Sequence, residues 1–274
     1  MSDDTPSRQP PILAEKHYEA PSVFDVANLM REARRQKGLP PGDVPPVCVL
    51  DPDGDLVDYV RARGLARPDP AWACYHTTLD VFDLDGVPVG IIGRVVGASF
   101  AVLVAEELFV SGCQLLISVT SAGQITPLGQ PPYFVLIERA LRDEGTSYHY
   151  LPPARYSHLA PGLRDRLWSR WDQGSVPLSI GASWTTDAPF RETAAMIAHC
   201  RAAGIAGVEM EAAALYALAT AKGYSIVCFA HVTNTMATAG DDFEKGPHQG
   251  SLATLAVIGE TIRCWRSVPG QEQH

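Results

Sequence analysis

The chain has 274 residues, of which 46% are hydrophobic and 19% charged, and its formal net charge is −9. This length and apolar content allow a full globular core, while the acidic balance and the lack of a long basic cluster argue against a nucleic-acid-binding protein. No apolar run reaches the ~18 residues of a membrane span, and the polar N-terminus resembles neither a signal nor a transit peptide.

The cysteine pattern indicates a protein of a reducing compartment, and the histidine pattern bears on metal binding. The six cysteines are scattered without a CxxC pair, and the eight histidines show no metal-ligand spacing. A disulfide framework and a zinc site are therefore not expected. We expect a cytoplasmic protein with no metal, no organic cofactor and no membrane partner.

In chain order, residues 1–20 resemble a loose arm, and residues 21–46 a helix over 22–37 followed by a proline-rich connector. One domain is expected over residues 47–268. Apolar periodicity and glycine or proline boundaries predict strands at 47–50, 72–84, 87–96, 115–120, 178–184, 208–210 and 225–232, an extended segment at 147–151, and helices at 99–111, 131–144, 191–203, 211–222 and 251–265. Early hairpin strands followed by strand–helix alternation predict a single-domain, three-layer α/β/α sandwich around a central mixed sheet.

Three strand ends carry residues suited to binding a ligand. Gly93 and Gly97 do not have the spacing of a dinucleotide-binding or P-loop motif, so a plain turn is an open alternative. The turn Ser121-Ala122-Gly123 can present backbone N–H and hydroxyl donors to an anion or a sugar. The third strand end runs into Thr186 and Asp187, and the alternative for Asp187 is that it caps the next helix.

The most specific stretch is Glu209-Met210-Glu211, at the junction of a strand and an Ala-rich helix. Strand side chains repeat every two residues, so the two glutamates are expected on one side. A carboxylate can accept hydrogen bonds from the two adjacent hydroxyls of a ribose, beside an apolar methionine. The alternative for either glutamate alone is a favourable interaction with the helix dipole.

These residues carry a resemblance. VEMEAAAL resembles the glutamate–methionine–glutamate signature of the family-1 nucleoside phosphorylases, the group of uridine phosphorylase and the hexameric purine nucleoside phosphorylases. Four further segments resemble that family in the same order, namely 97–108, 121–123, 186–187 and 229–236. The resemblance covers residues 47–265. It implies an α/β domain, a homo-oligomer (a dimer, or a hexamer built from dimers), phosphate as co-substrate, and a small-molecule nucleoside as substrate.

The resemblance also implies roles for individual residues. Catalytic roles fall on Glu211, Asn234 and Asp187, and substrate-binding roles fall on Met210, Glu209, Phe190, Arg191, Gly123 and Ala122. Glu211 would hold the ribose hydroxyls near an oxocarbenium-like C1′, and Phe190 would stack on the base. Asn234 falls where purine enzymes carry an acid and uridine phosphorylases an asparagine. An amide is no general acid but can hydrogen-bond a carbonyl, which favours pyrimidine or oxo-bases.

The phosphate site departs from the family pattern. The family's phosphate-binding glycine falls on Pro52, which has no N–H, and its arginines fall on Leu56, on Ser118 and near Val81. Phosphate binding relies on charge-assisted donors. Ser121 and Arg94 are the remaining candidates for binding an anion.

Three functions therefore stay open. The first is a uridine-type nucleoside phosphorylase with an altered anion pocket, and the second is a phosphate-independent nucleoside or nucleotide hydrolase. The third is a non-catalytic nucleoside-binding protein. The first two differ in the phosphate dependence of base release, and the third predicts no base release.

Overall fold

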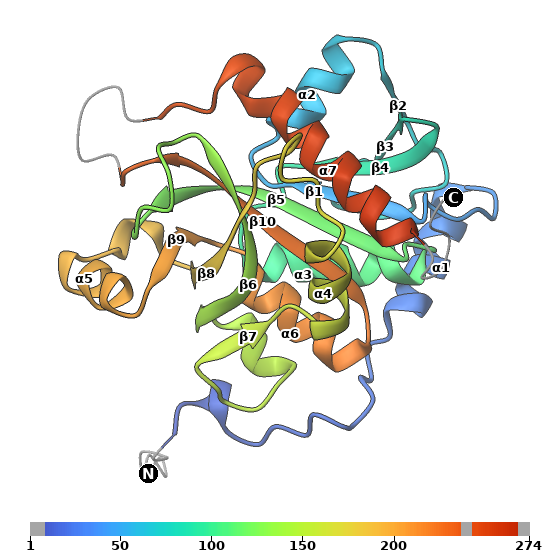
Figure 1. Ribbon diagram of the computed structural model, residues 1–274. Coiled ribbons are helices and arrows are strands. Elements are labelled where there is room, and N and C mark those ends of the chain that lie inside the picture. Colours follow the sequence, from blue (N-terminus) through green and yellow to red (C-terminus); the bar gives the residue numbers. More distant parts are fainter. Residues whose placement is uncertain (1–8, 237–242, 268–274) are drawn as a thin grey trace, which may run out of the picture.

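The computed structural model describes residues 9–236 and 243–267 (Figure 1). Its strands are β1 (Val47–Asp51), β2 (Ala66–Pro68), β3 (Asp80–Leu84), β4 (Val87–Gly93), β5 (Leu115–Gln124), β6 (Tyr133–Asp143), β7 (Tyr156–His158), β8 (Ser179–Thr186), β9 (Ile205–Glu209) and β10 (Ser225–Asn234). Its α-helices are α1 (Val26–Lys37), α2 (Asp55–Ala62), α3 (Ala98–Val110), α4 (Pro161–Trp168), α5 (Ala194–Ala202), α6 (Ala212–Lys222) and α7 (Ser251–Arg266). Residues 1–8 of the predicted arm lie outside the described residues, and so do residues 237–242 and 268 of the predicted domain.

The strands form one mixed sheet in the order β10-β6-β8-β9-β5-β1-β4-β3-β2. In addition, β10 pairs with β5 in parallel, so that five strands close on themselves into a barrel. The strands β1, β4, β3 and β2 extend the sheet beyond it. The α/β class with a central mixed sheet is thus confirmed, while the closure is a feature that local sequence patterns did not predict.

Helices cover both faces of the sheet. In Figure 1, α7 crosses the near face, with α2 and α4 beside it, whereas α3 and α6 lie behind the sheet. The helix α6 is buried over almost its whole length, because its alanines allow close contact with β6 and β10. Strands β1 and β9 are buried at every position, which is typical of strands covered on both sides.

The helix predicted over residues 131–144 is wrong, since this segment is strand β6. Its glutamate, leucine, alanine and arginine residues have good intrinsic helix propensity. The segment lies between β10 and β8 and hydrogen-bonds to both. Pairing on both edges outweighs a local preference worth only tenths of a kcal/mol per residue.

Other corrections concern boundaries. The first helix begins at Val26 and not at residue 22, because Asp25 is the N-cap and accepts from the Asn28 N–H at 2.8 Å. The strand expected over 72–84 is regular only from Asp80, and the extended segment expected at 147–151 is largely a 3₁₀ turn. Helix α2 was not predicted. No helix of the described residues has the length and apolar character needed to cross a membrane.

The pairing register brings four strand ends together. Gly123 at the end of β5 faces Val208 of β9, and Asn234 at the end of β10 faces Gly123. Thr185 near the end of β8 faces Glu209. Residues 121–123, 209–211 and 234, which the sequence analysis singled out, therefore lie together at one end of the barrel.

Candidate active site

Glu211 occupies the turn between β9 and α6, at the N-cap position of the helix. Its carboxyl group is 1% exposed and is held from two directions. Oε1 accepts from the Gly97 backbone N–H at 2.7 Å, and Oε2 accepts from the Met210 N–H at 3.3 Å. Gly97 has φ 94°, a conformation that L side chains rarely adopt. The turn before α3 can therefore deliver its N–H to the carboxyl from 114 residues away.

Glu209 was expected to bind substrate, but its carboxylate hydrogen-bonds to other groups of the protein. Its Oε1 accepts from the hydroxyls of Ser183 at 2.9 Å and Thr185 at 2.5 Å. Its Oε2 accepts from the N–H groups of Glu211 and Ala212, both at 2.7 Å. A carboxylate has about four acceptor positions, and all are engaged inside the protein. In this structure, Glu209 therefore fixes the start of α6 and the backbone of Glu211, and it offers no free acceptor to a substrate.

The two carboxyl groups are electrostatically distinct. Burial and then the neighbouring charge of Glu209 raise the pKa of Glu211 to about 8, against the opposing hydrogen bonds from Gly97, Thr120 and Met210. Burial also raises the pKa of Glu209, but four donors stabilise its charged form. With a pKa of about 8, Glu211 can exchange a proton near neutral pH.

The end of β5 forms the floor beside Glu211. Ala122 is buried, and Gly123 leaves no room for a side chain, because a Cβ atom there would lie 2.5 Å from the Met236 sulfur. Asn234 is buried nearby. Its Oδ1 accepts from the Met236 N–H at 2.9 Å, and its Nδ2 donates to the Thr233 hydroxyl at 3.2 Å. Met236 and Asn234 therefore cover the floor in this state of the protein.

The loop after β8 is exposed in this structure. Asp187 is exposed and accepts from the Gly145 N–H at 2.8 Å. Phe190 is 99% exposed and Arg191 follows it in a 3₁₀ turn. Among the described residues, no hydrogen bond joins Asp187, Phe190 or Arg191 to Glu211, and their roles at the base stay predictions. Asp187 is not the cap of α5 either, since Thr193 fills that position.

The position expected to bind an anion is filled by the chain itself. The Ser121 hydroxyl donates to Asp53 Oδ2. The Lys245 ammonium group lies 3.1 Å from the same oxygen and 2.5 Å from Asp55 Oδ2. Asp53, Asp55 and Lys245 were missed by the sequence reasoning, although Asp53 directly follows Pro52, where the family's phosphate-binding glycine falls.

Arg94, the other anion candidate, pairs with a residue outside this cluster. Its guanidinium group pairs with Asp58 on α2 at 2.5 Å, and both side chains are 57% exposed. Arg94 has φ 63°, which turns its backbone N–H onto the Asp51 carbonyl at 2.9 Å. The structure therefore does not support Arg94 as a buried anion ligand.

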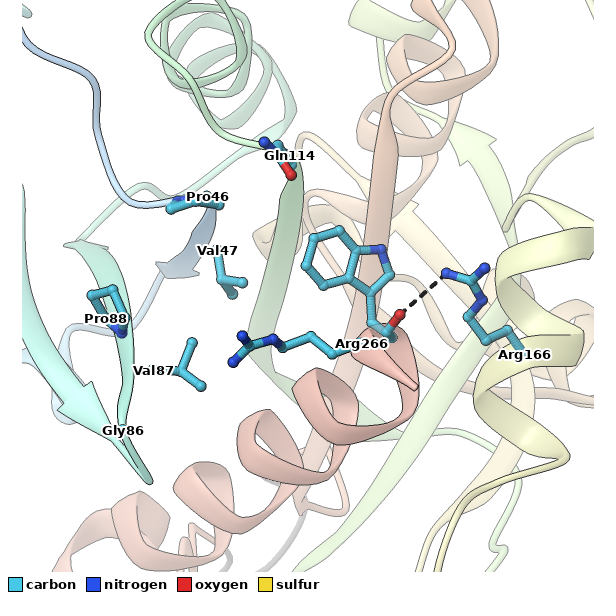
Figure 2. Close-up of a pocket in the computed structure, with 9 residues that line it drawn as sticks. Pro46, Val47, Gly86, Val87, Pro88, Gln114, Arg166 and Arg266 are labelled. Atoms are coloured by element: carbon cyan, nitrogen blue, oxygen red, sulfur yellow. Dashed lines mark hydrogen bonds between the residues drawn. The ribbon is translucent and has the colours of Figure 1, made fainter. Parts of the chain in front are cut away.

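The cavity between Ser121, Asp53, Lys245 and His231 has a volume of about 20 Å³. Larger cavities lie elsewhere. One of about 490 Å³ opens where β1 begins, between Val87 and the end of α7. Figure 2 shows Arg266 reaching into it, while Arg166 donates to the Trp265 carbonyl at 3.1 Å. This cavity contains none of the predicted site residues. Among the residues that the structure describes, no group of three or more His, Cys, Asp or Glu side chains could hold a metal ion.

Comparisons with curated proteins find nucleoside phosphorylases. The DeoD-type purine nucleoside phosphorylase of Streptococcus pyogenes serotype M5 (strain Manfredo) is 24% identical over 224 residues, covering 76% of this chain and 94% of that protein. The uridine phosphorylase of Thermococcus kodakarensis (strain ATCC BAA-918 / JCM 12380 / KOD1) is 28% identical over 221 residues, covering 73% of this chain and 79% of that protein.

Solved structures show the same fold. The purine nucleoside phosphorylase of Toxoplasma gondii in complex with immucillin-H has a TM-score of 0.68 at 14% identity, covering 82% of this chain and 94% of that one. The uridine phosphorylase of Vibrio fischeri ES114 complexed with 6-hydroxy-1-naphthoic acid has a TM-score of 0.63 at 20% identity, covering 84% and 96%. The family model of the phosphorylase superfamily matches residues 49–257, most of the chain. This protein therefore belongs to the phosphorylase superfamily, as an enzyme of the pentosyltransferase type.

Proposed function

We propose that this protein cleaves the N-glycosidic bond of a nucleoside and releases the free base. The observation that carries the proposal is the buried Glu211 carboxyl group, held by the Gly97 N–H at 2.7 Å where three other strand ends converge. Both curated relatives are named as nucleoside phosphorylases, which supports a nucleoside as the substrate.

Glu211 supplies the interaction with the sugar. Two adjacent hydroxyl groups of a pentose can donate to its two carboxyl oxygens, which replaces part of the hydration lost by burial. These donors favour the ionised form and lower the pKa of Glu211 from about 8 in the free protein. The negative charge then lies beside C1′ as this carbon becomes oxocarbenium-like and the base departs.

Asn234 determines which class of base is preferred. Its amide can donate to a carbonyl oxygen or accept from a ring N–H, which suits pyrimidine or oxo-bases. In the free protein this amide is engaged with Met236 and Thr233. Base binding thus requires Met236 to leave the surface of Gly123, and its unbranched thioether side chain allows several alternative positions.

The attacking group has two candidates, and each has support. Phosphate is supported by membership in the phosphorylase superfamily and by the Lys245 ammonium group at the anion position. Water is supported by the charges around that position, because Asp53 and Asp55 already neutralise Lys245. Either group transfers the pentose away from the base, so both are compatible with Glu211 in the role described.

The test is a panel of pyrimidine, oxo-purine and amino-purine nucleosides, incubated with and without phosphate, with free base as the readout. We expect release of uracil or of an oxo-purine base and loss of this release in Glu211→Gln. A folded wild-type protein that binds nucleosides without releasing any base would contradict the proposal and favour a binding protein. The homo-oligomer and the cytoplasmic location remain predictions that a single chain does not test.

A further inference from the structure

The anion end of the site contains an internal carboxylate in hydrogen-bonding position. Asp53 Oδ2 accepts from the Ser121 hydroxyl and pairs with Lys245 at 3.1 Å. Ser121 directly follows Thr120, whose hydroxyl interacts with Glu211. The carboxylate of Asp53 is thereby joined to the sugar-binding group through two consecutive residues of β5.

The charges around this position are unfavourable for a phosphate dianion. Asp53 and Asp55 both pair with the Lys245 ammonium group, whose side chain is 20% exposed, and the nearby Arg94 guanidinium group is already paired with Asp58. His231 lines the same cavity, but burial and then the charge of Lys245 lower its pKa to about 4, so it is neutral at pH 7. Asp51 also lines the cavity and adds no positive charge. A dianion placed here would meet more carboxylates than cations.

The free volume of the cavity beside Asp53 also disfavours phosphate. The cavity holds about 20 Å³, and a site needs roughly 10–15 Å³ to accept one water molecule. Phosphate has five heavy atoms and does not fit in the space of about one water. Its entry would require Asp53 to move away from both Ser121 and Lys245. A water molecule in this cavity would find donors and acceptors on Ser121, Thr120 and Asp53.

We infer that Asp53 is a specificity-determining residue: its carboxylate occupies the anion position, excludes phosphate and makes water the acceptor of the pentosyl group. This inference rests on the proposed function. In the net step, the oxygen of water bonds to C1′ and the C1′–N bond breaks, with its electron pair leaving on the base. One proton of water ends on the base, so the products are free base and free pentose, and no further reactant is consumed.

The experiment compares the wild-type protein with Asp53→Ser, which clears the position, and Asp53→Asn, which keeps the shape and removes the charge. Asp58→Ser is the matched control. Asp58 is also a solvent-facing aspartate paired with a cation, but it does not line the cavity. Inorganic phosphate binding is measured by calorimetry without nucleoside, and the sugar product is identified with and without phosphate.

In the wild-type protein and in Asp58→Ser, we expect no phosphate binding tighter than about 1 mM and free pentose as the sugar product. In Asp53→Ser, we expect phosphate affinity to rise at least about tenfold, with pentose 1-phosphate among the products. Asp53→Ala, which also clears the position, provides the same comparison if the serine variant does not fold. Asp53→Asn keeps the side-chain volume and should therefore gain less phosphate affinity than Asp53→Ser.

Phosphate binding by the wild-type protein, or pentose 1-phosphate as its product, would overturn the inference. A folded Asp53→Ser or Asp53→Ala variant that still rejects phosphate would also overturn it. If no nucleoside is cleaved at all, the proposed function fails, whereas the calorimetric comparison still decides whether Asp53 excludes phosphate.

Discussion

The two ends of the candidate site are built in opposite ways. At the sugar end, Glu211 and Glu209 are buried and fixed mainly by short backbone N–H and hydroxyl donors from β8, α6 and the turn before α3. At the anion end, the partners are charged side chains, because Asp53 and Asp55 both pair with the Lys245 ammonium group. The sugar end is thus determined by the fold itself, while the anion end depends on a few side chains.

This difference between the two ends indicates that residues of the anion end can be replaced at a smaller cost in stability than residues of the sugar end. A carboxyl group held by backbone donors can be lost only together with local structure, because those donors would be left unpaired. The ion pairs of Lys245 join side chains only, so replacing Asp53 or Asp55 leaves no backbone donor unpaired and should cost less stability. Substitutions at the two ends should therefore separate activity from stability, and the predictions below are ordered by expected effect.

The largest effect is expected from Glu209→Ala. It leaves the Ser183 and Thr185 hydroxyls and two N–H groups of α6 without their acceptor. A loss of about 3–5 kcal/mol in the free energy of unfolding is expected, measured by urea denaturation. Glu209→Gln, which keeps part of this network, should lose less, about 1–3 kcal/mol. Equal stability of the alanine variant and the wild type would show that Glu209 does not anchor the sugar end.

Glu211→Gln should mainly affect activity. It removes the negative charge that stabilises the oxocarbenium-like sugar as the base departs, and we expect base release to fall by about 10²–10³-fold. The amide can still accept from Gly97, so the melting temperature should stay close to that of the wild type. The readout is kcat/KM for base release beside a thermal unfolding curve. An active, folded Glu211→Gln variant would exclude the assignment of the sugar end.

The pH dependence follows from the raised pKa of Glu211, about 8 in the free protein. Because the ionised form is the one required, kcat/KM should rise with pH and level off above about 8. Stability should change in the opposite direction. The folded-state pKa lies above the unfolded value of about 4.3, so this contribution is fully present below about pH 4.3 and is lost as pH rises towards 8.

The slope of that decline should not exceed about 1.4 kcal/mol per pH unit for one proton. Urea denaturation at several pH values measures it, and Glu211→Gln should remove both this component and the rise in kcat/KM. If the variant keeps the same stability profile as the wild type, another group accounts for the pH dependence.

The smallest effects are expected from Arg94→Ala and Phe190→Ala. Arg94 makes an exposed ion pair, and Phe190 is 99% exposed. Each substitution should change the free energy of unfolding by less than about 1 kcal/mol, and base release should change by less than about threefold. A large loss of activity in Arg94→Ala would place an anion on this side of α2. A large loss in Phe190→Ala would mean that the loop closes over the base.

Part of the site could be predicted from the sequence. The stretch Glu209-Met210-Glu211 at a strand–helix junction, together with Ser121-Ala122-Gly123 and Asn234, was found from residue types and order. The structure brings these segments together at one edge of the barrel. The loop with Asp187 and Phe190 was assigned by the same resemblance, and in the structure Asp187 accepts from the Gly145 N–H while Phe190 is exposed, so this part of the assignment stays a prediction.

The sequence by itself determined what depends on neighbouring residues: the helix ends at Gly38 and Gly223, the Ala-rich α6 and the class of fold. Only the tertiary structure decided the strand state of β6, the separate tasks of the two glutamates and the pairing of Asp53 with Lys245 across 192 residues. The physical reason is that propensities and caps act within a few residues of the chain. Strand pairing, burial and ion pairs depend on which distant segments the fold brings into contact.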